Sequence, residues 1–136
     1  MSKKILVVDD DPGTIKLVSQ VLKKEGYKVI SAAGGREGLV KVKRDVPDLI
    51  VLDVMMPDIN GYEVCFYLKF SFQYKHIPIL ILTVREREMI EEVGRRVGIE
   101  YMKKPFRTDE LLRMVEEMLA KAPGPQDQSK EGKQEE

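Results

Sequence analysis

The chain lacks the features that mark secreted, membrane-spanning or nucleic-acid-binding proteins. A single cysteine among 136 residues excludes an internal disulfide. No apolar run approaches the roughly 20 residues that span a bilayer, and the first four residues lead into a predicted strand without a signal-peptide hydrophobic region. Lysine plus arginine and aspartate plus glutamate both total 23, so there is no basic excess for DNA or RNA. These absences predict a soluble, cytoplasmic protein with no membrane partner and no direct nucleic-acid partner.

What the chain does contain is an alternation of short apolar runs with segments of helical spacing. The runs are rich in β-branched residues and cover 5–8, 27–31, 49–52, 79–82 and 99–102. Between and after them, apolar residues recur three or four positions apart, at Ile15, Val18 and Leu22; Leu39, Val42 and Val46; Val64, Leu68 and Phe72; Ile90, Val93 and Val97; and Leu111, Val115, Met118 and Leu119. A strand–helix alternation of this kind predicts a doubly wound α/β domain, a parallel sheet with helices on both faces.

Boundary signals agree with that pattern. Asp11 before Pro12 predicts a helix N-cap with proline at the first helical position, and Thr108 before two acidic residues predicts another cap. Gly26 is a typical helix C-terminal stop. The segment 122–136 has too little apolar surface to fold, so we expect one domain over residues 1–121 followed by a disordered polar tail.

Polar side chains follow the ends of four predicted strands. Three aspartates occupy positions 9–11 and Asp53 ends the third run, while Thr83 and Lys104 follow the fourth and fifth. In open parallel sheets, ligands bind beyond the carboxyl ends of the strands. Carboxylates about 5 Å apart repel by roughly 3 kcal/mol per pair, and a hard cation such as Mg²⁺ offsets that cost. The sequence therefore predicts a site where a metal ion and a phosphoryl group meet.

Four segments together carry a specific resemblance. They are Ile5 to Asp11, Leu52 to Gly61, Leu82-Thr83 and Lys104 to Phe106. In order and spacing they resemble the receiver domain of bacterial and archaeal two-component response regulators. The resemblance implies a flavodoxin-like fold, with five strands in the order 2-1-3-4-5 and five helices. It also implies a phosphorylation-dependent signalling switch, which is not a true enzyme but assists its own phosphorylation and dephosphorylation.

The resemblance assigns a role to each residue of the acidic edge. Asp53 is the phosphoacceptor, receiving a phosphoryl group from a sensor histidine kinase or a histidine phosphotransfer protein. Asp9, Asp10, Asp53 and the backbone carbonyl of Met55 are the expected Mg²⁺ ligands. Lys104 pairs with Asp53 and then with its phosphate, and the Thr83 hydroxyl donates a hydrogen bond to the phosphoryl group.

The resemblance also implies how the signal is read out. Movement of Thr83 toward phosphate vacates space for Tyr101 to turn inward, and the face built by the fourth helix, fifth strand and fifth helix then binds a downstream protein. A plainer reading is that Tyr101 is a half-buried strand aromatic. A phosphorylation-dependent homodimer stays open. Val84 stands where alanine is frequent in this family, which suggests slow hydrolysis of the acyl phosphate.

Several residues have simpler explanations than a role in chemistry. Asp11 is expected to be a cap only, Cys65 to pack in a helix and His76 to be structural, and Asp58, Asn60 and Gly61 to be turn residues and nothing more. Two alternative functions also stay open. One is a magnesium-dependent phosphatase with an aspartyl nucleophile, of the haloacid dehalogenase type; the other is a receiver-like interaction module that never accepts phosphate.

Overall fold

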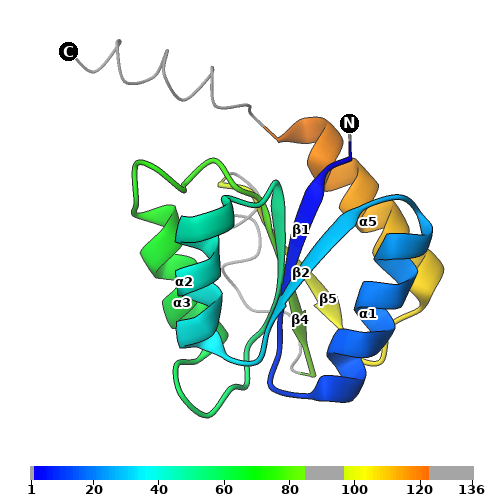
Figure 1. Ribbon diagram of the computed structural model, residues 1–136, viewed down its shortest axis with the longest axis horizontal. Helices are drawn as coiled ribbons and strands as arrows, with labels where there is room; N and C mark the ends of the chain where they lie inside the picture. Colours follow the sequence, from blue (N-terminus) through cyan, green and yellow to red (C-terminus); the bar gives the residue numbers. More distant parts are fainter. Residues whose placement is uncertain (1, 85–96, 123–136) are drawn as a thin grey trace.

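The computed structural model describes residues 2–84 and 97–122 and resolves a layered α/β arrangement (Figure 1). In chain order the elements are β1 (Lys4–Val8), α1 (Pro12–Lys24), β2 (Lys28–Ala32), α2 (Gly35–Asp45), β3 (Leu49–Asp53), α3 (Gly61–Lys69), β4 (Ile79–Thr83), β5 (Ile99–Lys103) and α5 (Thr108–Lys121). Four helices thus lie in the described part of the chain, where five were expected overall. The helix expected through Ile90 and Val93 falls outside the described residues, as does the polar segment from residue 123 onward.

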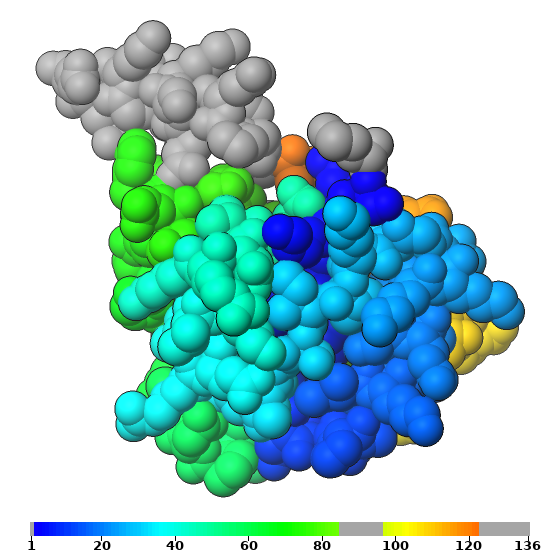
Figure 2. Space-filling view, in the orientation of Figure 1, coloured from blue at the N-terminus to red at the C-terminus, as the bar shows by residue number. Residues whose placement is uncertain are grey.

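The five strands form one sheet in the order β2-β1-β3-β4-β5, and every neighbouring pair is parallel. This confirms the predicted fold class and strand order. α1 and α5 cover one face of the sheet, while α2 and α3 cover the other (Figure 1). Figure 2, seen from the same direction, looks onto the β2 edge with α2 on its left and α1 on its right.

Two apolar cores lie on the two faces of the sheet. In β1, Leu6 and Val8 point toward the α2 and α3 side, whereas Ile5 and Val7 point toward α1 and α5. Every residue of β3 and β4 is buried. Strands that are covered on both faces have no solvent side to favour polar residues, so their sequences are continuously apolar. The polar residues of these strands are displaced to their ends, where the site lies.

Two of the predicted helix boundaries are confirmed. Asp11 caps α1, accepting hydrogen bonds from the Gly13 backbone N–H at 3.0 Å and the Thr14 hydroxyl at 2.9 Å. Gly26 follows the end of α1 with φ of +95°, in the left-handed region that glycine adopts readily. The expected cap at Thr108 is wrong by one position. Arg107 occupies the N-cap without a side-chain cap bond, and Thr108 is the first residue of α5.

Two apolar stripes extend past the helices that they predicted. α2 ends at Asp45, and Val46 is its left-handed C-cap with φ of 41°. α3 ends at Lys69, so Phe72 lies in the following loop with its side chain exposed. In both cases the spacing continued by chance after the backbone had left the helix. None of the described helices is both long and apolar enough to cross a bilayer.

Candidate functional site: an acidic pocket at the carboxyl edge of the sheet

The ends of four strands bring the predicted polar residues to one edge. Val8 of β1 lies opposite Leu52 of β3, so the next residues, Asp9 and Asp53, are neighbours. Both aspartates are buried, as is Thr83 at the end of β4. The Lys104 backbone N–H donates to the Thr83 carbonyl at 2.7 Å, which fixes the segment after β5 beside the end of β4.

A single ammonium group bridges two of the carboxylates. Lys104 Nζ lies 3.1 Å from Asp9 Oδ2 and 3.2 Å from Asp53 Oδ1. The other oxygen of Asp9 accepts a hydrogen bond from the Asp11 backbone N–H at 2.9 Å. Asp9 therefore has both of its oxygens engaged in the described structure. The lysine joins β5 to β1 and β3, although the three strands are distant in sequence.

Negative charge exceeds positive charge in this pocket. Burial, followed by the neighbouring Asp9 charge, raises the pKa of Asp53 above its usual value, and the attraction to Lys104 does not fully offset them. For Lys104, burial acts to lower the pKa, but the Asp9 and Asp53 carboxylates together outweigh it and the pKa is raised. Lys104 thus stays protonated, and the ionised form of Asp53 carries a cost that added positive charge would reduce.

The carboxylate oxygens fit a small divalent cation. One oxygen each from Asp9, Asp10 and Asp53 lie within 4.8 Å of one another, and in residues 2–84 and 97–122 this is the only such group of potential metal ligands. Octahedral Mg²⁺ binds oxygens at about 2.1 Å, which places neighbouring ligands about 3 Å apart. The donor set, all hard oxygen, is the type that Mg²⁺ prefers.

Asp58 holds the loop after Asp53 in place and has a larger structural role than the sequence predicted. Asp58 was expected to be a turn residue only, but its two oxygens accept from the Gly35 and Arg36 backbone N–H groups at 3.1 and 3.0 Å. Asp58 therefore caps α2, whose own N-cap residue, Gly34, makes no side-chain cap bond. The backbone hydrogen bond from Arg36, helped by that from Ile59, lowers the pKa of Asp58 to about 2.

The other end of the same loop is fixed by Gly61, also expected to be only a turn residue. A Cβ at this position would lie 2.2 Å from the Asp53 carbonyl oxygen and 2.8 Å from Val54 Cα, so only glycine fits. The Gly61 N–H donates to the Val54 carbonyl at 2.9 Å. Asn60 caps α3 by accepting from the Glu63 N–H at 3.0 Å. All three residues therefore position the loop that carries Met55.

The burial of three further residues considered in the sequence, Tyr101, Met55 and Cys65, can be read from the structure. Tyr101 is 6% exposed, so it is a buried rather than half-buried residue of β5, opposite Ile81 of β4. The Met55 side chain is exposed. Cys65 is buried in α3, as predicted, and burial raises the pKa of its thiol to about 11. Such a thiol is a packing residue and a poor nucleophile at neutral pH. The Lys104–Pro105 peptide bond is cis, which the sequence did not predict.

Fold and site together define a class: doubly wound α/β domains with a lysine-bridged acidic pocket at the carboxyl edge of the sheet. Comparison with known proteins identifies the family within this class. Residues 5–116 match the response regulator receiver domain family. The chain therefore belongs to the receiver domains of two-component signalling.

Two curated relatives differ in how much of them the chain covers. It is 42% identical over 123 residues to the alkaline phosphatase synthesis transcriptional regulatory protein PhoP of Bacillus subtilis, a match that includes 90% of this chain and 50% of PhoP. It is 30% identical over 118 residues to protein PilH of Pseudomonas aeruginosa, a match that includes 86% of this chain and 98% of PilH. The chain thus spans about half the length of PhoP but nearly all of PilH.

Solved structures agree with the fold. Chemotaxis protein CheY4 of Vibrio cholerae superimposes with a TM-score of 0.78 at 35% identity, covering 87% of this chain and 99% of CheY4. Response regulator TrrA of Thermotoga maritima, solved in complex with Mg²⁺ and BeF, superimposes with a TM-score of 0.74 at 34% identity, covering 85% of this chain and 98% of TrrA.

Proposed function

We propose that this receiver domain is a cytoplasmic, phosphorylation-dependent switch that accepts a phosphoryl group on Asp53 from a sensor histidine kinase or a histidine phosphotransfer protein. The observation that carries this proposal is the Lys104 ammonium group at 3.2 Å from a buried Asp53 carboxylate, within a cluster of further carboxylates. An Asp53 oxygen attacks phosphorus, forming an acyl phosphate as the bond from phosphorus to the histidine nitrogen breaks. The electron pair of that bond stays on the imidazole, which takes up a proton from water and departs neutral, while the charge at Asp53 goes from one negative unit to two.

Asp9, Asp10, Asp53 and the backbone carbonyl of Met55 would hold Mg²⁺ in this scheme. The ion would supply positive charge to the oxygens of the phosphoryl group during transfer. The hard oxygen ligands within 4.8 Å of one another support this assignment. So does the similarity to TrrA, whose structure contains Mg²⁺ with BeF. The contacts of Asp58 and Gly61 keep the loop of Met55 in place beside Asp53.

Lys104 and Thr83 respond once the phosphoryl group has arrived. Lys104 already lies between Asp9 and Asp53, and a phosphoryl oxygen would take over as its partner without a large displacement. The buried Thr83 hydroxyl donates to another phosphoryl oxygen. Tyr101 lies on β5 opposite Ile81, two residues before Thr83 on the neighbouring strand. A shift of Thr83 would therefore change the space available to the Tyr101 ring. The domain assists its own phosphorylation through these groups, and it assists its own dephosphorylation when water attacks the acyl phosphate, which restores the Asp53 carboxylate and releases inorganic phosphate.

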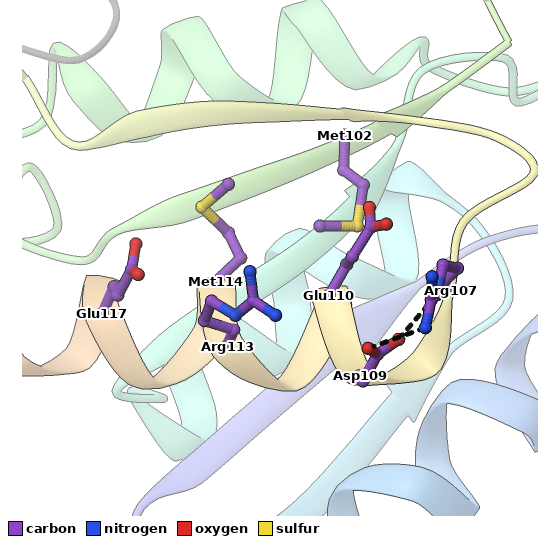
Figure 3. Close-up of a pocket in the computed structure, with 7 residues that line it drawn as sticks. All are labelled: Met102, Arg107, Asp109, Glu110, Arg113, Met114 and Glu117. Atoms are coloured by element: carbon purple, nitrogen blue, oxygen red, sulfur yellow. Dashed lines mark hydrogen bonds and ion pairs between the residues drawn. The ribbon is translucent and has the colours of Figure 1, made fainter.

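The face that includes β5 and α5 is the proposed contact with a downstream protein. A groove of about 570 Å³ lies there, with Met102 and Met114 as its apolar part. Its charged residues are of both signs: Arg107 at the N-cap of α5, and Asp109, Glu110, Arg113 and Glu117 along the helix (Figure 3). Flexible methionines adapt to different partners, and the charges can select among them. Tyr101 and Met102 are neighbours in β5 but belong to the cores on opposite faces of the sheet, so a change at the Tyr101 ring would reach this groove through the β5 backbone. A homodimer formed through the same face is an alternative outcome.

Mass spectrometry after exposure to acetyl phosphate tests the proposal. Wild-type protein with Mg²⁺ should gain the mass of one phosphoryl group, whereas protein in excess EDTA or the Asp53→Asn variant should not. Asp45→Asn is a matched control, because Asp45 pairs on the surface with Arg44 at 3.0 Å, away from the pocket. Absence of any mass gain in folded wild type would favour the interaction module that never accepts phosphate. Turnover of p-nitrophenyl phosphate would favour the phosphatase alternative.

A further inference from the structure

The aromatic residues of the chain are concentrated in one short segment that the phosphorylation site does not use. Six of the nine tyrosines and phenylalanines fall within residues 62–74. Four of them have exposed side chains: Phe66 is 50% exposed, Tyr67 47%, Phe70 87% and Phe72 51%. We call these four residues the aromatic surface. They lie on the outer side of α3 and in the loop that leads to β4.

The fold does not require aromatic residues at these positions. The inner side of α3 is already formed by buried Val64, Cys65 and Leu68. The opposite side of such a helix is normally polar. Phe66 and Phe70 lie one helical turn apart, with ring centroids separated by 6.4 Å, so their exposed rings adjoin. Contiguous exposed apolar surface on a folded domain marks a binding site, and aromatic residues are enriched at the centres of protein interfaces.

Basic residues outnumber acidic residues beside the aromatic surface. The segment 62–76 contains Lys69 and Lys75 and one acidic residue, Glu63, whose carboxylate accepts a hydrogen bond from Asn60 Nδ2 at 3.4 Å. Lys75 Nζ lies 4.8 Å from the Phe72 ring centroid, and Lys43 Nζ of α2 lies 5.3 Å from the Tyr67 ring centroid. Lys69 instead points its ammonium group at the Lys75 and Ile77 carbonyls, at 3.1 and 2.6 Å, which holds the loop in place. The aromatic surface therefore has a basic edge formed by Lys43 and Lys75.

This combination of rings and charges discriminates among occupants. A second copy of the chain would add the same two lysines to the interface, and like charges at an interface oppose association. Anionic lipid gains only about 1 kcal/mol per lysine near its surface and is bound by clusters of four to eight. Nucleic acid binding likewise draws on several phosphate contacts. An apolar segment flanked by acidic residues matches both the rings and the two lysines.

We propose that the aromatic surface docks an apolar, acid-flanked segment of a partner protein, and does so whether or not Asp53 is phosphorylated. The loop between α3 and β4 lies at the end of the sheet where the strands begin, at the upper left in Figure 1 and in green in Figure 2. Asp53 lies at the opposite end, where β3 finishes. The surface is thus separate from the phosphoacceptor pocket and from the groove along α5, so one partner can stay bound while the other face switches.

Selection from random twelve-residue peptides displayed on phage reads out the partner chemistry directly. The full chain is the target, and phage that also bind the Phe70→Ser/Phe72→Ser double variant are removed. The expected consensus contains apolar residues flanked by aspartate or glutamate. Selected peptides should bind the double variant, and separately Lys43→Glu/Lys75→Glu, at least about tenfold more weakly than wild type. Leu17→Ser, which alters an exposed leucine of α1, is the matched control and should bind as wild type does.

The same peptides distinguish this proposal from its rivals and from the switch itself. Asp53→Asn should bind them with unchanged affinity, so failure of phosphorylation would leave the result intact. Unfolding curves must show that each variant is folded. A neutral or basic consensus, or no consensus, would overturn the proposal. So would a wild-type dimer that the double variant abolishes, or binding of polyuridylate or phosphatidylglycerol vesicles that depends on Phe70 and Phe72.

Discussion

The excess of negative charge in the pocket predicts that Asp53→Asn stabilises the metal-free protein. Carboxylates no more than 4.8 Å apart repel by at least about 3.5 kcal/mol at an effective dielectric of about 20, and Asp53 has two such neighbours, Asp9 and Asp10. Lys104 at 3.2 Å returns about 5 kcal/mol. The balance is roughly 2 kcal/mol against the ionised Asp53, before its desolvation, which has the same sign. Screening around exposed Asp10 reduces this, so we expect a gain of about 1 kcal/mol.

The pH dependence has a definite sign. Because the pKa of Asp53 is raised on folding, the native state holds this proton more tightly than the unfolded state does. Between the unfolded value and the raised value, stability therefore falls as the pH rises. The advantage of Asp53→Asn should be greatest above the raised pKa and should shrink as the pH is lowered through that window. Added Mg²⁺ should stabilise wild type more than the variant, since only wild type has the third carboxylate.

Urea unfolding followed by far-ultraviolet circular dichroism in EDTA measures the difference. The control Asp45→Asn should change the free energy of unfolding by no more than about 0.5 kcal/mol, because in the described part of the chain the side chain of half-buried Asp45 pairs only with its exposed neighbour Arg44. If Asp53→Asn were instead destabilised at pH 7 without metal, the attraction to Lys104 would dominate. The view of the pocket as a site in need of positive charge would then be wrong.

Three further predictions follow from the loop after Asp53 and from α3. Gly61→Ala should lose about 3 kcal/mol of stability in urea unfolding, because its Cβ would lie 2.2 Å from the Asp53 carbonyl oxygen; a loss below 1 kcal/mol would mean that the loop yields easily. Asp58→Ala should lose about 1 kcal/mol at pH 7 after allowance for exposure. Since the pKa of Asp58 is about 2, that contribution is present above pH 4 and is lost as the pH falls toward 2, so wild type and variant should converge there in acid unfolding curves. Cys65, with a pKa of about 11, should react with iodoacetamide at pH 8 far more slowly in the folded than in the urea-unfolded protein; equal rates would show that α3 opens readily.

The parts of the fold that the sequence predicts are those set by local pattern. Apolar runs and helical spacing indicate the parallel sheet, because both faces of each central strand must be covered. The proximity of Asp9, Asp53 and Lys104 could be predicted because the carboxyl ends of parallel strands lie at a common edge of the sheet. The cap at Asp11 was predictable for a local reason: the capping side chain and the proline at the first helical position are adjacent in the sequence.

The parts that the sequence did not predict depend on contacts between distant segments. Asp58 caps a helix whose N-terminus lies 23 residues earlier, and no local signal distinguishes that role from a turn. Gly61 is needed because of the Asp53 carbonyl, which approaches it only in the folded chain. Phe72 continued the spacing of Val64 and Leu68 although the helix had already ended. The shift of the α5 cap from Thr108 to Arg107 is the ordinary uncertainty of helix ends.

The two attachments of the loop between β3 and α3 determine where the pocket can give way. On one side, the loop is held by the close approach of Gly61 to the Asp53 carbonyl and by the hydrogen bonds of the Asp58 carboxylate to the start of α2. Both arrangements restrict its movement. On the other side stand a threonine hydroxyl and the flexible stem of a lysine. We therefore expect an anion that binds beside Asp53 to displace Thr83 and Lys104, and with them the ends of β4 and β5, more than the start of α2.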